Sequence, residues 1–230
     1  MTRLFSISTY TSRLVISLLL VSITSAAFSQ PKIFKVEKDS IPVYRGIAIS
    51  ADLVGPAMLL LSDHGEYEGA LRVNLHDEIF PVVEIGIGRA NHDNDEVTGI
   101  TYKTKAPYFR LGVDWNLLKN KHRPNRLYGG FRYAYTNYTV DIIRQQFPDP
   151  VWQYDSGFGV EGMGCWQHWL EGVLALDAKV AGPLHLGWAV RYKRRLFHHE
   201  GEIGRTWYVP GYGIYGNSRM SANFYIIFDI

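Results

Sequence analysis

The feature that most constrains the fold of this chain is a regular alternation of apolar and polar residues, repeated along most of its length. In the segment 108–117 every second residue is apolar, and the residues between them are Tyr, Arg, Gly, Asp and Asn. Because successive side chains of a β-strand point to opposite faces, this period of two predicts a strand with two unlike faces. Together with seven similar segments, it predicts eight strands within residues 46–53, 70–76, 83–88, 108–117, 127–136, 170–180, 184–193 and 223–230.

The connections between these segments alternate between short and long. The short ones follow the second, fourth and sixth segments, and the long ones lie near residues 55–66, 91–106, 140–168 and 198–218. An even number of strands, with short turns at one end and long loops at the other, is typical of bacterial outer-membrane barrels. The sequence therefore predicts an all-β fold: an eight-stranded antiparallel up-and-down transmembrane β-barrel whose last strand pairs with its first.

The beginning of the chain has the pattern of a secretory signal peptide. Arg3 and Arg13 supply positive charge, residues 14–23 form an apolar run too short to span a bilayer, and Ala27 and Ser29 place small residues where a signal peptidase cleaves. We expect cleavage near Ser29 and export to the outer membrane of a Gram-negative bacterium. The expected organisation is a signal peptide over 1–29, a short periplasmic lead-in over 30–43 and a barrel domain over 44–230.

Loss of this leader removes two arginines and leaves 22 basic and 22 acidic residues, so the mature chain is neutral. A neutral chain lacks the basic field that gathers nucleic acid, which excludes that class of partner. Cys165, the single cysteine, excludes an intrachain disulfide and falls in the largest expected loop.

Alternation alone does not say which face points inward, and a soluble barrel or sandwich with an apolar interior is the alternative. Three features favour the membrane. The polar face mixes small and large residues as a narrow lumen requires, its charges nearly balance as buried charges must, and the chain ends inside a strand that carries Phe224 and Phe228 and can close the ring. The predicted lumen charge network consists of Asp52, Arg72, Glu84, Arg110, Asp114, Arg132, Glu171, Asp177, Lys179, Arg191 and Lys193. Interfacial aromatic girdles are predicted from Tyr44, Tyr108, Trp115, Tyr128, Trp169, Tyr192 and Tyr208.

Four stretches of the chain carry a family resemblance: Pro107–Leu118, Leu127–Tyr133, Leu186–Tyr192 and Trp207–Gly213. Through them most of the mature chain resembles a Bacteroidota family of small outer-membrane barrels of unknown function. The resemblance implies a barrel in the outer membrane and brings no substrate, cofactor or catalytic residue. The chain departs from the usual pattern at its end, since outer-membrane barrels commonly end in an aromatic residue and this one ends in Ile230.

Several polar groups are candidates for sites of chemistry. The acidic segment 92–96 lacks the spacing of a calcium loop, and the neighbouring His198 and His199 point to opposite sides of an extended chain, so we predict no metal site and no cofactor. A lipid-modifying enzyme is the first alternative function, with the candidates Ser62, His64, Glu66 and His168. An accessory subunit of an envelope secretion machine is the second.

The function favoured by the sequence is a non-enzymatic outer-membrane barrel with a plugged lumen, because eight strands enclose room for side chains rather than for a channel. Its surface loops are expected to bind a partner or to organise the envelope. The expected partners are outer-membrane lipids, the barrel-assembly machinery and an envelope protein. Exposed aromatics give contact area at low entropic cost, so the loop candidates for binding are Trp152, Trp166, Trp207, Tyr212 and Tyr215.

Overall fold

The computed structural model describes residues 42–95, 98–148 and 155–230. The expected signal peptide, nearly all of the lead-in, Glu96 and Trp152 lie outside the described residues. The principal strands are β1 (Tyr44–Asp52), β2 (His64–Leu75), β3 (Ile79–His92), β4 (Ile100–Asn116), β5 (Arg126–Pro148), β6 (Asp155–Ala181), β7 (Leu184–His199) and β10 (Ser218–Asp229). Between them lie helix α2 (Val54–Leu61) and the two short strands β8 (Tyr208–Val209) and β9 (Gly213–Ile214).

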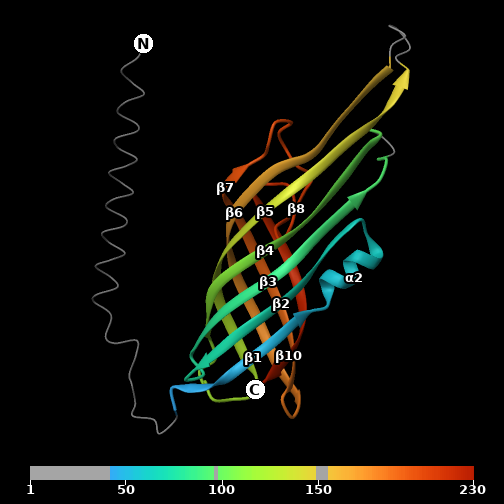
Figure 1. Cartoon of the computed structure of the whole chain (residues 1–230). Coiled ribbons are helices and arrows are strands. Elements are labelled where there is room, and N and C mark those ends of the chain that lie inside the picture. Colours follow the sequence, from blue (N-terminus) through green and yellow to red (C-terminus); the bar gives the residue numbers. More distant parts are fainter. Residues whose placement is uncertain (1–41, 96–97, 149–154) are drawn as a thin grey trace, which may run out of the picture. The chain divides into compact units, whose positions relative to one another are not determined.

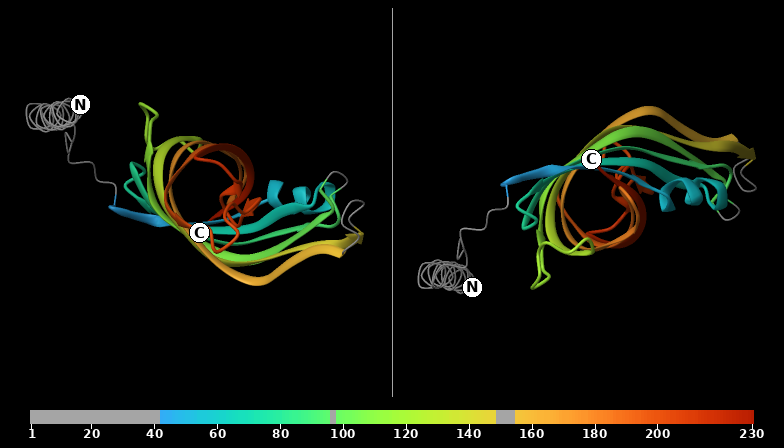
Figure 2. Two further views of the ribbon diagram at one scale, coloured as in Figure 1. Left: turned by 90° about the horizontal axis from the view of Figure 1, so that it is seen from above. Right: turned by 90° about the horizontal axis from the view of Figure 1, so that it is seen from below.

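The eight principal strands form a closed, antiparallel ring in the order β1-β10-β7-β6-β5-β4-β3-β2 (Figures 1 and 2). Strands that are neighbours in the sequence are neighbours in the ring. The ring closes where β1 pairs with β10, in a register that sets Ala48 opposite Asp229 and Ala51 opposite Ile226. This confirms the predicted all-β, eight-stranded antiparallel barrel and the pairing of its last strand with its first.

The apolar face of each strand points outward and the charged face points inward, as predicted for a membrane barrel. In β5, Phe131 points outward with 66% of its surface exposed, whereas its neighbour Arg132 is 1% exposed. The same contrast separates Phe109 from Arg110 in β4. Apolar side chains therefore form the outer wall of the ring, and the charged side chains fill its interior.

The ring has a turn end, which carries the short connections and the C-terminus, and a loop end, which carries the long ones. At the loop end β5 and β6, of 23 and 27 residues, run past the other strands as an extended sheet (Figure 1). Crossing a bilayer takes only about 9–11 strand residues. The prediction of long loops over 91–106 and 140–168 is wrong for most of those residues, because the alternation continues there on pairs such as Tyr102–Ile142 and Val140–Met163.

The connection between β7 and β10, expected as a surface loop over 198–218, folds inward instead. Its β8–β9 hairpin buries Tyr208, Val209 and Tyr212 against the inner face of the extended sheet, where Trp169 and Tyr138 also lie. The hairpin folds inward because removing these apolar and aromatic side chains from water is favourable. The hairpin therefore covers the interior of the barrel at its loop end.

The first connection, expected as a loop over 55–66, contains α2. Both oxygens of the Asp52 carboxylate accept hydrogen bonds from the first turn of this helix, from Val54 N at 3.3 Å and Gly55 N at 2.7 Å. Gly55 is required there, because a Cβ would lie 2.1 Å from the carbonyl oxygen of Glu66. Helix α2 thus packs directly on the start of β2. In the described part of the chain, no helix has the length and apolarity to cross a membrane.

Candidate functional site: the sealed lumen

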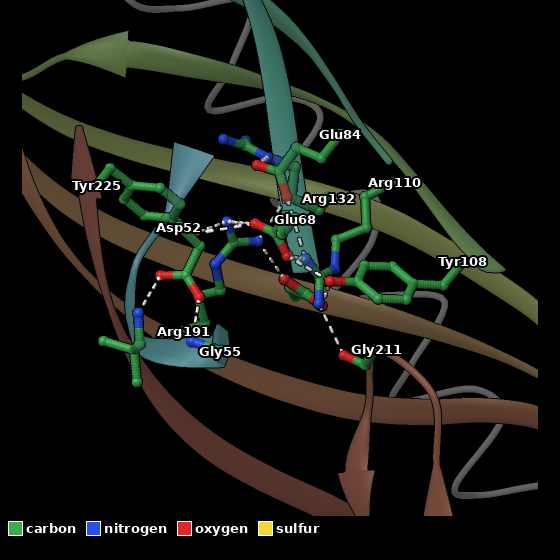
Figure 3. A network of polar contacts seen from close by, with 12 residues as sticks. Asp52, Gly55, Glu68, Glu84, Tyr108, Arg110, Arg132, Arg191, Gly211 and Tyr225 are labelled. Carbon is green, nitrogen blue, oxygen red and sulfur yellow. Dashed lines mark hydrogen bonds and ion pairs between the residues drawn. The ribbon is translucent and has the colours of Figure 1, made fainter. Parts of the chain in front are cut away.

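The centre of the barrel holds a connected network of four carboxylates and four guanidinium groups: Glu68, Glu84, Asp114, Glu171, Arg72, Arg110, Arg132 and Arg191. Figure 3 labels five members of this network: Glu68, Glu84, Arg110, Arg132 and Arg191. They come from β2 to β7, so strands far apart in the sequence are tied together through their side chains. Burial of ions costs desolvation free energy, and the attraction between equal numbers of opposite charges offsets that cost.

Arg191 of β7 joins the two sides of the network. Its Nη1 lies 2.7 Å from Oε2 of Glu84 and 2.9 Å from Oε2 of Glu171. Its Nη2 lies 3.1 Å from Oε1 of Glu68 and donates to the hydroxyl of Tyr225 at 2.6 Å. One guanidinium group therefore contacts three carboxylates, an arrangement for which the planar, five-donor geometry of arginine is suited and that of lysine is not.

Arg132 and Arg110 occupy the neighbouring positions. Arg132 makes a two-pronged contact with Asp114, with both distances 2.8 Å, and its Nε lies 2.9 Å from Glu84. The Nη1 of Arg110 contacts Glu68, and its Nε lies 2.9 Å from Glu171. Gly130 lets Arg132 and Asp114 meet, since a Cβ at Gly130 would lie 2.0 Å from Oδ1 of Asp114.

A second polar cluster lies nearer the turn end. Oδ1 of Asp177 lies 2.7 Å from Nδ1 of His185, and Arg126 lies 2.9 Å from Asp229. The prediction that Lys179 belongs to the lumen network is wrong: its side chain is exposed beside the β6–β7 turn, where a register shift after Lys179 interrupts the alternation.

The β8–β9 hairpin is bound to the lumen from above. The carbonyl oxygen of Gly211 accepts a hydrogen bond from Nη2 of Arg110 at 2.7 Å (Figure 3). It also accepts one from Nζ of Lys193 at 2.8 Å. Gly211 has a φ of +78°, and a Cβ there would lie 2.4 Å from the ring of Tyr108. Lys193 thus contacts the backbone of the hairpin, and in the described chain it makes no ion pair with a carboxylate.

The space left beside the central network is small, and a cavity of about 140 Å³ lies nearer the turn end, lined among others by Arg72, Phe80 and Arg126. The cavity beside the central network, lined among others by Arg72, Arg132, Tyr128 and Tyr225, has a volume of about 20 Å³. That volume accommodates about one water molecule. The lumen is therefore filled by charged and aromatic side chains at mid-height and covered by the hairpin at the loop end.

The aromatic candidates for binding are not all on the surface. Trp166 is exposed on the outer wall and stacks on His199 at 6.3 Å between ring centroids, and Trp207 and Tyr215 are half-buried. The prediction that Tyr212 offers a contact surface is wrong, because the hairpin carries its ring inward against Trp169.

The girdle prediction is likewise wrong for four residues that share the inward face with the charges: Tyr108, Tyr128, Trp169 and Tyr208. The outward-pointing members are exposed, namely Tyr44, Trp115 and Tyr192.

The residues predicted for lipid chemistry make contacts at separate places in the barrel. The hydroxyl of Ser62 donates to the backbone oxygens of Met58 and His64. The ring of His64 packs against Tyr208, whereas His168 lies on the outer wall with Nδ1 2.7 Å from the hydroxyl of Tyr133. Among the described residues, no group of three or more His, Cys, Asp or Glu side chains has the geometry to hold a metal ion.

Glu68 is as central to the network as Glu84, but it lies before the segment in which the alternation predicts a strand. The strand predicted over 70–76 begins in fact at His64, so Glu68 and Glu66 share the inward face of Arg72. Extending the alternation backwards by two pairs of residues would have found both. Cys165, expected in a loop, is a buried residue of β6.

Comparison with solved structures finds similarity to two outer-membrane proteins. It is similar to a major outer membrane protein from Thermus thermophilus, with 12% identity and a TM-score of 0.45 over 80% of this chain and 98% of that one. It is also similar to Ail, the attachment invasion locus protein of Yersinia pestis, solved with the heparin analogue sucrose octasulfate, with 8% identity and a TM-score of 0.37 over 80% and 93% of the two chains. Both likenesses concern the fold alone.

No curated protein matches the sequence. A family model described as a domain of unknown function (DUF6048) matches residues 11–229, and the chain therefore belongs to the DUF6048 family.

Proposed function

We propose that this protein is a non-enzymatic integral barrel of the outer membrane whose lumen conducts nothing and whose loop end is a rigid binding surface outside the cell. The observation that carries the proposal is the division of the strands into an apolar outer wall and a charged, filled interior. A soluble protein would have to expose that outer wall to water, whereas hydrocarbon accepts it.

The extended sheet supports the binding role. Strands β5 and β6 have more than twice the length that a bilayer requires, so about half of each would stand outside it. The inner face of this extension is supported by the hairpin and its apolar contacts. A rigid, supported sheet suits the display of a contact surface to an envelope partner better than the transport of a solute.

Ion conduction tests the sealed lumen. We expect the purified protein, inserted into planar bilayers, to add no unitary currents to those of the bare membrane. Insertion is checked separately by the slower migration of heated samples that distinguishes folded from unfolded barrels on a gel. Stable, reproducible channel currents from correctly inserted protein would contradict the proposal.

Thiol labelling in whole cells tests the location and the orientation. In a Cys165→Ser background we would introduce Phe158→Cys in the exposed part of β6 and Lys119→Cys in the exposed β4–β5 turn. We expect a membrane-impermeant maleimide to label Phe158→Cys in intact cells, and Lys119→Cys only after the outer membrane is permeabilised. Equal labelling of both in intact cells, or recovery of the protein in the soluble fraction, would overturn the proposal.

A further inference from the structure

The barrel wall has a seam where β1 ends early. The last Cα pair of β1 with β10 joins Asp52 to Tyr225, and the last backbone hydrogen bond runs from Leu53 N to Phe224 O at 2.8 Å. Strand β10 extends to Ser218 at the loop end, paired there with β7 alone. Among the described residues, the gap between this free edge of β10 and the start of β2 is bridged by helix α2 and not by a strand.

A pocket of about 330 Å³ lies in this seam. We call it the seam pocket. It is lined from five sides by α2, β2, β7, β10 and the β8–β9 hairpin, which contribute among others Met58, Glu66, Lys193, Asn223 and Tyr212. This volume is at the lower end of the range for small-molecule sites and suits a compact polar group.

The interior of the seam pocket holds polar atoms that the protein leaves without partners. The side-chain oxygen of Asn223, a residue 5% exposed, and the buried hydroxyl oxygen of Ser221 have no hydrogen-bond partner. The carboxylate of Glu66 accepts no hydrogen bond and forms no ion pair within the described chain. Buried polar groups are normally satisfied, so two unsatisfied acceptors on one pocket, with the half-buried carboxylate of Glu66 beside them, indicate a ligand that donates hydrogen bonds.

The ammonium group of Lys193 lines the same pocket and is 3% exposed. It donates to the carbonyl oxygens of Gly211 and Tyr212, at 2.8 and 3.4 Å, which leaves one of its three donors uncommitted. Within the described chain it makes no ion pair with Glu66. The pocket therefore presents a positive and a negative group that form no direct ion pair with each other, a pattern complementary to a zwitterion.

The rim of the seam pocket is apolar and faces outward. Met220 and Met58 both line the pocket and are exposed, Met220 by 72%, and Leu60 of α2 is exposed by 88%. Met220 pairs with Tyr192, an exposed aromatic of the outer wall, in the register between β10 and β7. Exposed tyrosines are enriched at the level of lipid head groups, so the pocket opens sideways at that level.

We propose that the seam pocket binds the head group of a membrane lipid that carries a primary ammonium beside an anionic group, as phosphoethanolamine does. The ammonium would donate to Glu66 and Asn223, the anionic group would face Lys193, and the acyl chains would leave over Met58 and Met220 into the bilayer. This inference rests on the proposed location in the outer membrane and adds a ligand to it.

Retention of lipid by the purified barrel tests the proposal. The protein is reconstituted in nanodiscs that hold equal amounts of phosphatidylethanolamine, phosphatidylcholine and phosphatidylglycerol, and the lipids that stay bound on release are identified by native mass spectrometry. We expect phosphatidylethanolamine to be enriched several-fold over the other two. Choline has no N–H to donate, and glycerol has no cation for Glu66.

Variants of the pocket give the second arm, because a hydrogen bond to a charged group is worth about tenfold or more in affinity. Asn223→Leu, Glu66→Gln and Lys193→Met are each expected to abolish the several-fold enrichment of phosphatidylethanolamine. The matched controls are Glu161→Gln in the exposed part of β6 and Lys119→Met in the exposed β4–β5 turn, which should retain it.

The outcomes are separable from those of the proposed function. Equal retention of the three lipids, or enrichment that survives all three pocket variants, would overturn the lipid site while the barrel still inserts and folds. Binding of free phosphoethanolamine without retention of the lipid would overturn it in favour of a soluble ligand. Failure to insert into nanodiscs at all would instead contradict the proposed membrane location.

Discussion

Arg191 and Glu84 meet in the interior of the barrel, with Nη1 of Arg191 2.7 Å from Oε2 of Glu84, although they are 107 residues apart in the sequence. Their strands, β7 and β3, are not neighbours in the ring. The contact therefore crosses the lumen instead of following the wall. Contacts of this kind connect strands that are not neighbours in the ring through the interior of the barrel.

Removal of Arg191 should be among the most damaging single changes in the lumen. Arg191→Met leaves Glu68, Glu84 and Glu171 with one cation fewer, and breaking a buried ion cluster typically costs about 3–5 kcal/mol. We expect a loss of this size in the free energy of unfolding, measured by urea titration of the barrel in lipid vesicles. Arg194→Met is the control, because Arg194 is exposed. Equal effects of the two changes would show that the network does not hold the lumen together.

The hairpin should come loose when Gly211 gains a side chain. In Gly211→Ala the new Cβ meets the ring of Tyr108 at a backbone φ of +78°, and we expect faster tryptic cleavage at the exposed Arg205 while the barrel stays folded. Gly204→Ala is the matched control, since Gly204 also has a positive φ, of +93°, but has nothing within 4 Å of its Cβ position. Equally fast cleavage of both variants would show that the positive φ, and not the contact with Tyr108, causes the effect.

The turn end should respond to acid through Asp77, which lies in the turn between β2 and β3. Burial of this carboxylate opposes its ionisation, but hydrogen bonds with His122 and Asn74 and the charge of Arg45 outweigh burial and lower its pKa. Because the folded pKa lies below the unfolded one, the stabilisation is fully present above about pH 4 and is lost as the pH falls through the folded pKa.

We therefore expect Asp77→Asn to lower the free energy of unfolding by about 1–2 kcal/mol at pH 7 and by less at pH 2–3. Unfolding by urea at both pH values measures the effect, with Glu161→Gln as an exposed control. A loss that is the same at both pH values would mean that the ionised carboxylate is not what stabilises the turn.

The ring of strands could be predicted from the sequence because its cause is local. Alternation such as that of Phe109, Arg110 and Leu111 depends on the backbone geometry of a strand and needs no knowledge of its neighbours. The inward charges were identified for the same reason, apart from Glu68, which lies before the segment where the alternation was recognised, and Lys179, where it breaks at a turn.

The inward fold of the β8–β9 hairpin could not be predicted from local alternation. It depends on long-range contacts, such as the hydrogen bond from Arg110 to Gly211 O, across 101 residues. Nothing in the local sequence distinguishes an aromatic residue that faces the bilayer interface from one that fills the mouth of a barrel. The seam pocket was missed too, because it arises where β1 stops at Asp52 while β10 continues to Ser218, and strand ends are set by pairing.

The central claim, that apolar side chains face lipid while charged ones fill the lumen, is tested most directly with two of the chain's own tryptophans. Trp188 is 60% exposed on the outer wall, and Trp169 is buried on the inner side. Variants that retain one of them, with every other tryptophan replaced by phenylalanine, are inserted into vesicles of brominated lipids, which quench tryptophan fluorescence on contact. We expect strong quenching of Trp188 and little of Trp169. Equal quenching of both, or stronger quenching of Trp169, would contradict the claim.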